Sequence, residues 1–193
     1  QNALLKITEE PPKSAYFILT TQNSDSVPYT IKSRGRLGLF HMEPYTEEEL
    51  VKYADGALDS EVLEIARTPG DIEELKSMNT KVTGFANFCN NVFYNLGAVS
   101  GPNALKITQY FKLKENDEGY SPDLFFKAML TKYCAKMRDT DVKSERNMYC
   151  DLISITVSAM YNLTIPGLKK DSIIDMWIMQ ARRAIFKWEG DKE

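Results

Sequence analysis

Side chains that could do acid–base, nucleophilic or metal chemistry are few and scattered in this sequence. A single histidine, His41, excludes most centres that need two imidazoles. Cys89, Cys134 and Cys150 are far apart, and each lies in an apolar stretch. Metal sites favour close cysteine pairs and secreted frameworks favour an even count, so these residues are predicted to be buried free thiols. No metal site is therefore expected.

Neighbouring carboxylates do not indicate a catalytic centre either. Glu73-Glu74 and Asp117-Glu118 fall on predicted helix surfaces or in a loop, where nothing brings a reacting partner to them. The sequence has no phosphate-binding loop of the form G-x-x-x-x-G-K-[ST] and no acidic cluster after an apolar strand. We therefore expect no bound cofactor in this chain and no ATP hydrolysis by the chain alone.

The charge balance argues against direct recognition of nucleic acid. The 24 basic and 27 acidic side chains give a net charge of −3, which provides no overall attraction to a phosphate backbone. Two basic clusters lie on predicted helices: Lys132, Lys136 and Arg138, and Arg182, Arg183 and Lys187. They are expected to be solvated helix faces, because no aromatic residues are interleaved to form a basic groove.

No segment indicates insertion into a membrane or export. No apolar run approaches the about 20 residues that cross a bilayer. The first residues also lack the basic start and long apolar stretch of a targeting peptide. A cytoplasmic protein is therefore expected.

Residues 1–43 have the pattern of a partial α/β layer. A helix over 2–10 is predicted to end at Pro11, and a short helical stretch lies around 27–34. The apolar runs 15–21 and 36–42 have the length of strands buried on two faces. Because two strands cannot bury both faces or satisfy their edges, we expect further strands outside these residues to complete a sheet.

Residues 44–78 are expected to form a small helical subdomain. Thr46 and Glu49 have the spacing of a capping box, so a helix should follow and end near Gly56. A second helix is predicted over 58–67. A third should begin at Pro69 and run toward residue 77.

Residues 79–193 are predicted to form a bundle of about five helices. Amphipathic or capped patterns place them at 79–99, 102–112, 121–139, 146–162 and 170–189, with a loop at 114–120. The last helix carries Trp177 and Trp188 on its apolar stripe. These tryptophans either pack in the bundle's own core or form part of an oligomer interface.

Three motifs in residues 2–36 resemble a known family when they are taken together. They are NALLKITEEPP (2–12), YFILTT (16–21) and VPYTIKSRGR (27–36). In this order and spacing they resemble the second half of the AAA+ ATPase core of bacterial clamp-loader subunits, the delta-prime and tau/gamma subunits of DNA polymerase III. The resemblance implies a mainly α fold: a remnant of an α/β AAA+ core (1–43), a helical lid (44–78) and a helical collar that mediates oligomerisation (79–193).

The resemblance also implies site residues. Arg34, in the position of the family's Ser-Arg-Cys motif, would reach in trans toward the ATP-Mg of a neighbouring subunit and stabilise the transferring phosphoryl group. Thr21 matches the sensor 1 position, which would face the γ-phosphate. The alternative for Arg34 is a surface arginine that pairs with a nearby acid. The alternative for Thr21 is a threonine at a strand end that caps the next turn. Gly35 replaces the family's cysteine and Arg36 follows it, which weakens the correspondence.

The lid motif favours a subunit that does not hydrolyse ATP. Where ATP-binding relatives have a sensor 2 arginine, this sequence has Gly70, as delta-prime subunits do; Arg67, three residues earlier, is the nearest substitute. The resemblance thus implies a delta-prime-like clamp-loader subunit that assembles with tau/gamma and delta, and acts on the sliding clamp and primer-template DNA through that assembly. We interpret the sequence as the C-terminal portion of a longer polypeptide. The alternatives are an ATP-hydrolysing tau/gamma-type subunit with its Walker motifs upstream, and a stand-alone helical interaction module.

Overall fold

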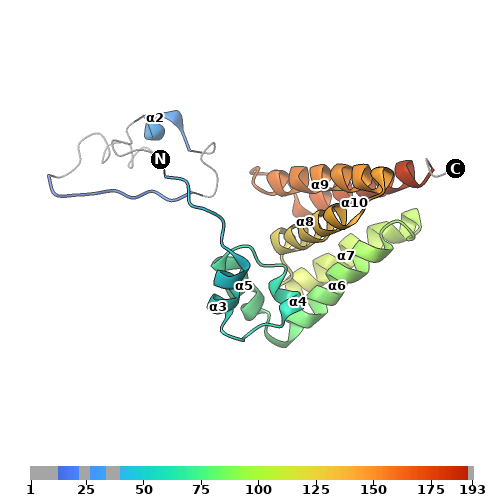
Figure 1. The fold of residues 1–193 in the computed structure, drawn as a ribbon, viewed down its shortest axis with the longest axis horizontal. Helices are drawn as coiled ribbons and strands as arrows, with labels where there is room; N and C mark the ends of the chain where they lie inside the picture. The colour runs from blue at the N-terminus through green and yellow to red at the C-terminus, as the bar shows by residue number, and fades with distance from the viewer. Residues whose placement is uncertain (1–12, 22–26, 34–39, 191–193) are drawn as a thin grey trace. The chain divides into compact units, whose positions relative to one another are not determined.

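The computed structural model describes residues 13–21, 27–33 and 40–190. The chain divides into two compact units, Gln1–Glu43 and Pro44–Glu193 (Figure 1). The described part is mainly α-helical, as the sequence predicts. The two units are considered separately below.

The described residues of the first unit contain one short helix, α2 (Tyr29–Lys32), and no strand. The prediction of a strand over 15–21 is therefore wrong for this structure, and residues 40–42 of the second predicted strand are not in a strand either. Successive side chains of the first run are exposed: Tyr16 by 88%, Phe17 by 48%, Ile18 by 90% and Leu19 by 54%. A strand needs a neighbour for its backbone groups, and none is described beside these residues. The predicted helix 2–10 lies outside the described residues.

The second unit begins with three short helices, α3 (Glu47–Ala54), α4 (Ser60–Leu63) and α5 (Pro69–Ser77). The predicted capping box is present: the Glu49 amide donates to the Thr46 hydroxyl, and a Glu49 carboxylate oxygen accepts from the Thr46 amide. Asp55, in the left-handed region at φ 51°, ends α3 just before Gly56. The first and third predicted helices are thus confirmed.

The second predicted helix is much shorter than the range 58–67. After α4 the backbone tightens, because the amides of Ile65 and Ala66 donate to carbonyls only three residues earlier. Ile65 and Ala66 are still buried. The apolar pattern of this range therefore marks burial correctly, but the segment is a turn that leads into the next helix.

Five α-helices follow over residues 79–190: α6 (Val82–Asn95), α7 (Gly101–Glu118), α8 (Pro122–Asp139), α9 (Lys143–Leu163) and α10 (Lys170–Gly190). A short 3₁₀ turn, η2 (Asn79–Lys81), precedes α6. Helices α8 and α9 pack along each other, as do α9 and α10 (Figure 1). The predicted five-helix bundle is confirmed.

The predicted loop over 114–120 is wrong, because α7 continues to Glu118. The acidic residues that indicated a loop are held by lysines: Lys114 contacts Glu118 at 2.5 Å and Lys170 contacts Glu115 at 2.8 Å. Gly119 then adopts φ 73° and ends the helix, as glycine does at this position. An ion pair at i, i+4 and an ion pair with the neighbouring helix α10 thus offset the weak helix propensity of this stretch.

Trp177 lies in the centre of the bundle core and is 1% exposed. Its ring makes edge-on contacts with Phe125 and Phe126, with centroids 5.3 Å and 5.6 Å away, and its Nε1 donates to the Thr156 hydroxyl at 3.0 Å. The core interpretation of this tryptophan is confirmed. Trp188 is half-buried and donates to Asp151 at 2.9 Å.

Replacing Trp177 by Phe is expected to lower the free energy of unfolding by about 1–2 kcal/mol, because the smaller ring leaves a void and loses the bond to Thr156. Urea unfolding followed by circular dichroism measures the change. Trp188→Phe is the matched control and should cost less than about 1 kcal/mol, since this ring is already partly hydrated. An equal loss in the two variants would contradict the central role of Trp177.

None of the described helices is both long enough and apolar enough to span a membrane. Within the same residues, no group of three or more His, Cys, Asp or Glu side chains is arranged to hold a metal ion.

Candidate functional site

The segment that leads to Arg34 forms a single helical turn. In α2 the amides of Ile31 and Lys32 donate to the Pro28 carbonyl at 2.9 Å and 3.1 Å, so this proline begins the turn. Ser33 ends it, with its amide bonded to the Tyr29 carbonyl at 2.8 Å. The predicted short helix is therefore confirmed. Arg34 follows at once, but it lies outside the described residues, as do Gly35 and Arg36.

Thr21 is exposed at the end of the extended residues 15–21. No strand is present in this range, so the carboxyl end of a sheet, on which the sensor 1 interpretation depends, is not formed within the described part of the chain. The role of Thr21 stays a prediction.

The first turn of α5 is capped by a carboxylate of the chain itself, that of Asp71. The Asp71 carboxylate accepts from the amides of Arg67 at 2.8 Å and Thr68 at 3.0 Å, and the Thr68 hydroxyl accepts from the Asp71 amide at 3.2 Å. This capping box satisfies backbone donors that would otherwise be open to a bound anion. Gly70 is exposed, and a methyl group there would meet only the Thr68 hydroxyl at 3.6 Å, so the fold does not require glycine at this position.

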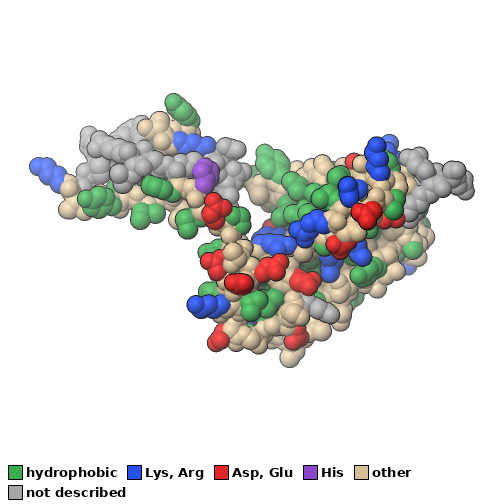
Figure 2. Space-filling model, viewed as in Figure 1, with side chains coloured by type: hydrophobic (Ala, Val, Ile, Leu, Met, Phe, Trp, Pro, Cys, Tyr) green, Lys and Arg blue, Asp and Glu red, His purple; other side chains and the backbone are tan. Residues whose placement is uncertain are grey.

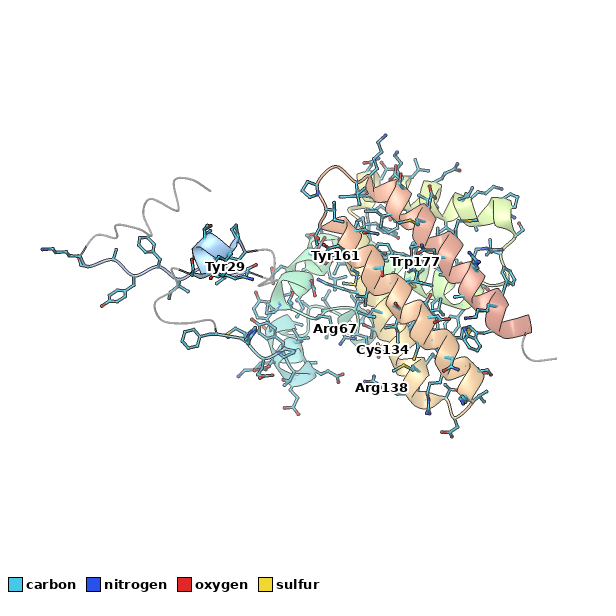
Figure 3. The ribbon with its side chains drawn as sticks, turned by 90° about the horizontal axis from the view of Figure 1, so that it is seen from above. Tyr29, Arg67, Cys134, Arg138, Tyr161 and Trp177 are labelled. Carbon is cyan, nitrogen blue, oxygen red and sulfur yellow. The ribbon has the colours of Figure 1, made fainter. Side chains whose placement is uncertain are left out.

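Arg67, the nearest cation to this turn, is directed toward α8. Its Nη2 donates to the Thr131 hydroxyl at 2.5 Å. Figure 3 labels Arg67 within the helical unit. The Thr131 hydroxyl in turn donates to the Lys127 carbonyl at 2.9 Å. Arg67 therefore joins the short helices to α8.

Lys127 completes this link between α5 and α8. Its ammonium lies 2.7 Å from Asp71 and 2.6 Å from Asp123, and the side chains of Lys127 and Asp71 are only 17% and 6% exposed. Burial by itself lowers the pKa of Lys127, but the hydrogen bonds to Asp123 and Asp71 outweigh it and raise the pKa above the usual lysine value. Sequence analysis missed this network; the i, i+4 spacing of Asp123 and Lys127 was its only visible sign.

The two basic clusters differ from the prediction of solvated helix faces in one respect. Arg182 is only 8% exposed, and it donates to the carbonyls of Leu96 and Val99, where α6 ends. It therefore caps α6 as a cation at a helix C-terminus. On the face shown in Figure 2, acidic and basic side chains are interspersed over the helical unit. This face of the helical unit thus shows no continuous basic track for nucleic acid.

Residues 1–44 match a family model. Its description is DNA polymerase III, delta subunit. The resemblance to the delta-prime family of this polymerase is therefore confirmed for this segment, which includes Thr21, Ser33 and Arg34. The match leaves residues 45–193 unassigned. No curated protein and no solved structure matches the chain.

The three cysteines are free, as predicted, but only Cys89 is buried. Burial raises the pKa of its thiol far above the ordinary value, so it is inert at neutral pH. Cys134 is half-buried, and Cys150 is exposed on α9 with its Sγ 3.5 Å from Met137 Sδ. The prediction of burial is therefore wrong for Cys150, because the apolar residues around it occupy the other face of the helix.

Proposed function

We propose that this protein is a delta-prime-like subunit of a DNA polymerase III clamp loader, one that assembles with tau/gamma and delta subunits without hydrolysing ATP itself. The observation that carries the proposal is the family match over residues 1–44, which coincides with the first compact unit and contains Ser33 and Arg34. In this role Arg34 acts on the ATP-Mg of a neighbouring subunit, and the sliding clamp and primer-template DNA are reached through the assembly.

The chemistry of α5 supports a subunit that does not clamp its own nucleotide. A sensor 2 role needs a cation directed outward from this helix start, and Gly70 supplies none. Arg67 is bonded to Thr131 and Lys127 to two carboxylates, so both nearby cations are engaged. The Asp71 carboxylate also places a negative charge where a phosphate would have to approach.

The exposed apolar run in the first unit supports a partial AAA+ core. Tyr16 and Ile18 are about as exposed as in an unfolded chain, at 88% and 90%, and they alternate with Phe17 and Leu19. Apolar side chains on both faces suit a strand buried inside a sheet. We propose that strands from outside residues 1–43 cover this run in the complete core, and that residues 44–78 and 79–193 act as lid and collar.

Size-exclusion chromatography with light scattering tests the assembly. The protein is mixed with the tau/gamma and delta subunits from the same source, and a stable complex larger than any pair is expected. A chain that elutes as a free monomer from every mixture would contradict the proposal and favour the stand-alone module. ATP turnover by the protein alone, abolished by a blocker of nucleotide sites, would favour the tau/gamma-type alternative.

A further inference from the structure

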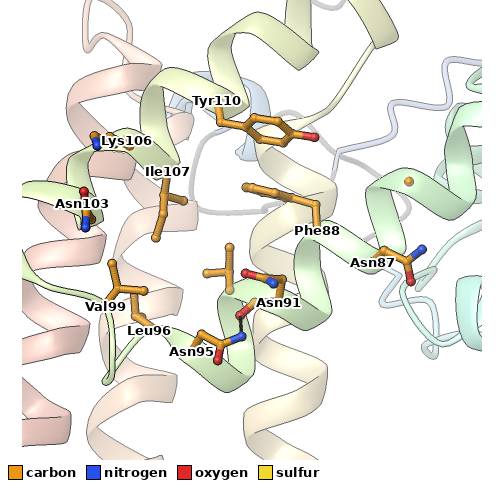
Figure 4. Close-up of a pocket in the computed structure, with 12 residues that line it drawn as sticks. Asn87, Phe88, Asn91, Asn95, Leu96, Val99, Asn103, Lys106, Ile107 and Tyr110 are labelled. Atoms are coloured by element: carbon orange, nitrogen blue, oxygen red, sulfur yellow. Dashed lines mark hydrogen bonds between the residues drawn. The ribbon is translucent and has the colours of Figure 1, made fainter.

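A groove of about 600 Å³ lies between α6 and α7 of the helical unit (Figure 4). Its floor is apolar and is formed by Phe88, Val92, Leu96, Val99 and Ile107. The Phe88 ring stacks on Tyr110 with centroids 5.4 Å apart, which closes one end of the floor. Phe88 and Ile107 are half-buried and Tyr110 is 45% exposed, so the floor is accessible.

The rim of this groove is made of carboxamides. Asn87, Asn91 and Asn95 follow one another at four-residue steps along α6, and Asn103 lies opposite on α7. Asparagine is one of the weaker helix formers, so three of them in one exposed row lower the helix propensity of α6. The Asn95 side-chain Nδ2 donates to the backbone carbonyl of Asn91 at 3.0 Å. The side chains of Asn87 and Asn91 make no hydrogen bond to any residue that the structure describes.

The spacing of this row matches an extended peptide. Rows of residues at i, i+4 run at about 26° to the helix axis, so their members are about 6.7 Å apart along the row. Two residues of an extended strand also span about 6.6–6.8 Å. In such a strand every second residue presents its N–H and its C=O to the same side, and a carboxamide offers one acceptor and two donors side by side. Successive asparagines can therefore bond to successive residue pairs of one peptide.

The charge of the groove sets the chemistry of the peptide further. Lys106 is the one charged residue among those that line it, and it is exposed and forms no ion pair within the described residues. A carboxylate on the peptide would neutralise this ammonium. An α-helix as occupant would leave the row without partners, because a helix bonds its own backbone internally. Extended backbone therefore fits the carboxamides better.

We propose that the α6–α7 groove binds an extended peptide segment of a partner protein, through backbone hydrogen bonds to Asn91 and Asn95. Alternate apolar side chains of the peptide enter the floor beside Phe88 and Ile107, and a carboxylate pairs with Lys106. This peptide site does not depend on the clamp-loader assignment, because it is built only from residues of the helical unit.

The probe is a set of short synthetic peptides in which Leu or Phe alternates with Ser, Thr or Asn, each ending in Asp with a free or an amidated C-terminus. Fluorescence anisotropy measures their dissociation constants for the full chain, and the NMR signals of the asparagine side-chain amides report the site. At least one peptide is expected to bind and to shift the Asn91 and Asn95 amide signals.

Two variants test the site. Replacing Asn91 and Asn95 together by Ala should weaken binding about tenfold or more, through loss of the backbone bonds, and it raises helix propensity, so unfolding cannot explain the loss. Asn90→Ala, in the same helix but outside the groove, is the matched control and should leave binding unchanged. Lys106→Ala should remove any difference in affinity between the peptides with a free C-terminus and those with an amidated one.

Three results would overturn the site. The first is that no peptide of the set binds more tightly to the protein than to the double alanine variant. The second is that a peptide locked as a helix by a side-chain staple binds better than its extended counterpart. The third is that Asn90→Ala weakens binding as much as the double variant does.

Discussion

Replacing Arg34 by Ala is expected to lower the ATPase rate of the assembled clamp loader by about 10³-fold or more, while the assembly still forms. The guanidinium is a planar, permanently charged group that stabilises the negative charge on the transferring phosphoryl oxygens, and loss of such an arginine has effects of this size. The protein holds no nucleotide of its own in this interpretation, so the effect must appear at a neighbour's site. Steady-state phosphate release by the reconstituted complex measures it.

Two further variants separate this role from a general effect of charge. Arg34→Lys keeps the charge but loses the planar fork, and it should recover only a small part of the rate. Arg36→Ala removes a cation two residues away and should change the rate less than about threefold. If Arg34→Ala leaves the rate of a fully assembled complex unchanged, Arg34 has no part in ATP hydrolysis and is a surface arginine.

The helical unit was predictable from sequence wherever a helix end carries its own chemistry. Thr46, Pro69 and Ser121 each precede or open a helix whose start was predicted to within a residue, because caps act locally. The end of α7 was missed because Lys170, more than fifty residues away, helps to hold Glu115 in a helix. A contact between residues far apart in the chain cannot be recognised from the residues around a helix end in a single sequence.

The candidate site residues come only from a motif. Arg34 is singled out by three motifs in order, whereas composition and periodicity single out no arginine, and its role stays a prediction. The link through Arg67, Asp71 and Lys127 could not be predicted, because it joins the start of α5 to two residues of α8 that come near only in the fold. The strand over 15–21 was predicted from apolarity alone, and apolarity does not supply the neighbouring strand that its backbone needs.

The Asp71–Lys127 pair fixes the short helices on the bundle, and its loss is expected to have the largest effect on stability. Asp71→Ala removes the acceptor of two backbone amides and leaves a largely buried ammonium with one partner, the half-exposed Asp123. Removing one member of such a buried pair costs about 3 kcal/mol or more. Urea unfolding should show this loss, together with an earlier, separate transition of residues 44–78.

The matched control is Glu74→Ala, which removes an exposed carboxylate from the same helix and should change stability by less than about 0.5 kcal/mol. Combining Asp71→Ala with Lys127→Met should cost no more than Asp71→Ala alone, because the uncompensated charge is then absent. A loss for Asp71→Ala as small as that of the control would show that the pair does not hold α5 on α8.

The pH dependence follows from the direction of the lysine shift. Because the pKa of Lys127 is raised in the folded state above 10.5, its contribution is complete below that pH and is lost as the pH rises through the folded value. The difference in stability between the wild-type protein and Asp71→Ala should therefore stay constant from neutral pH to about pH 10 and narrow above it. A difference that instead narrows between neutral pH and pH 9 would mean that another group, and not the Lys127 ammonium, carries the link between α5 and α8.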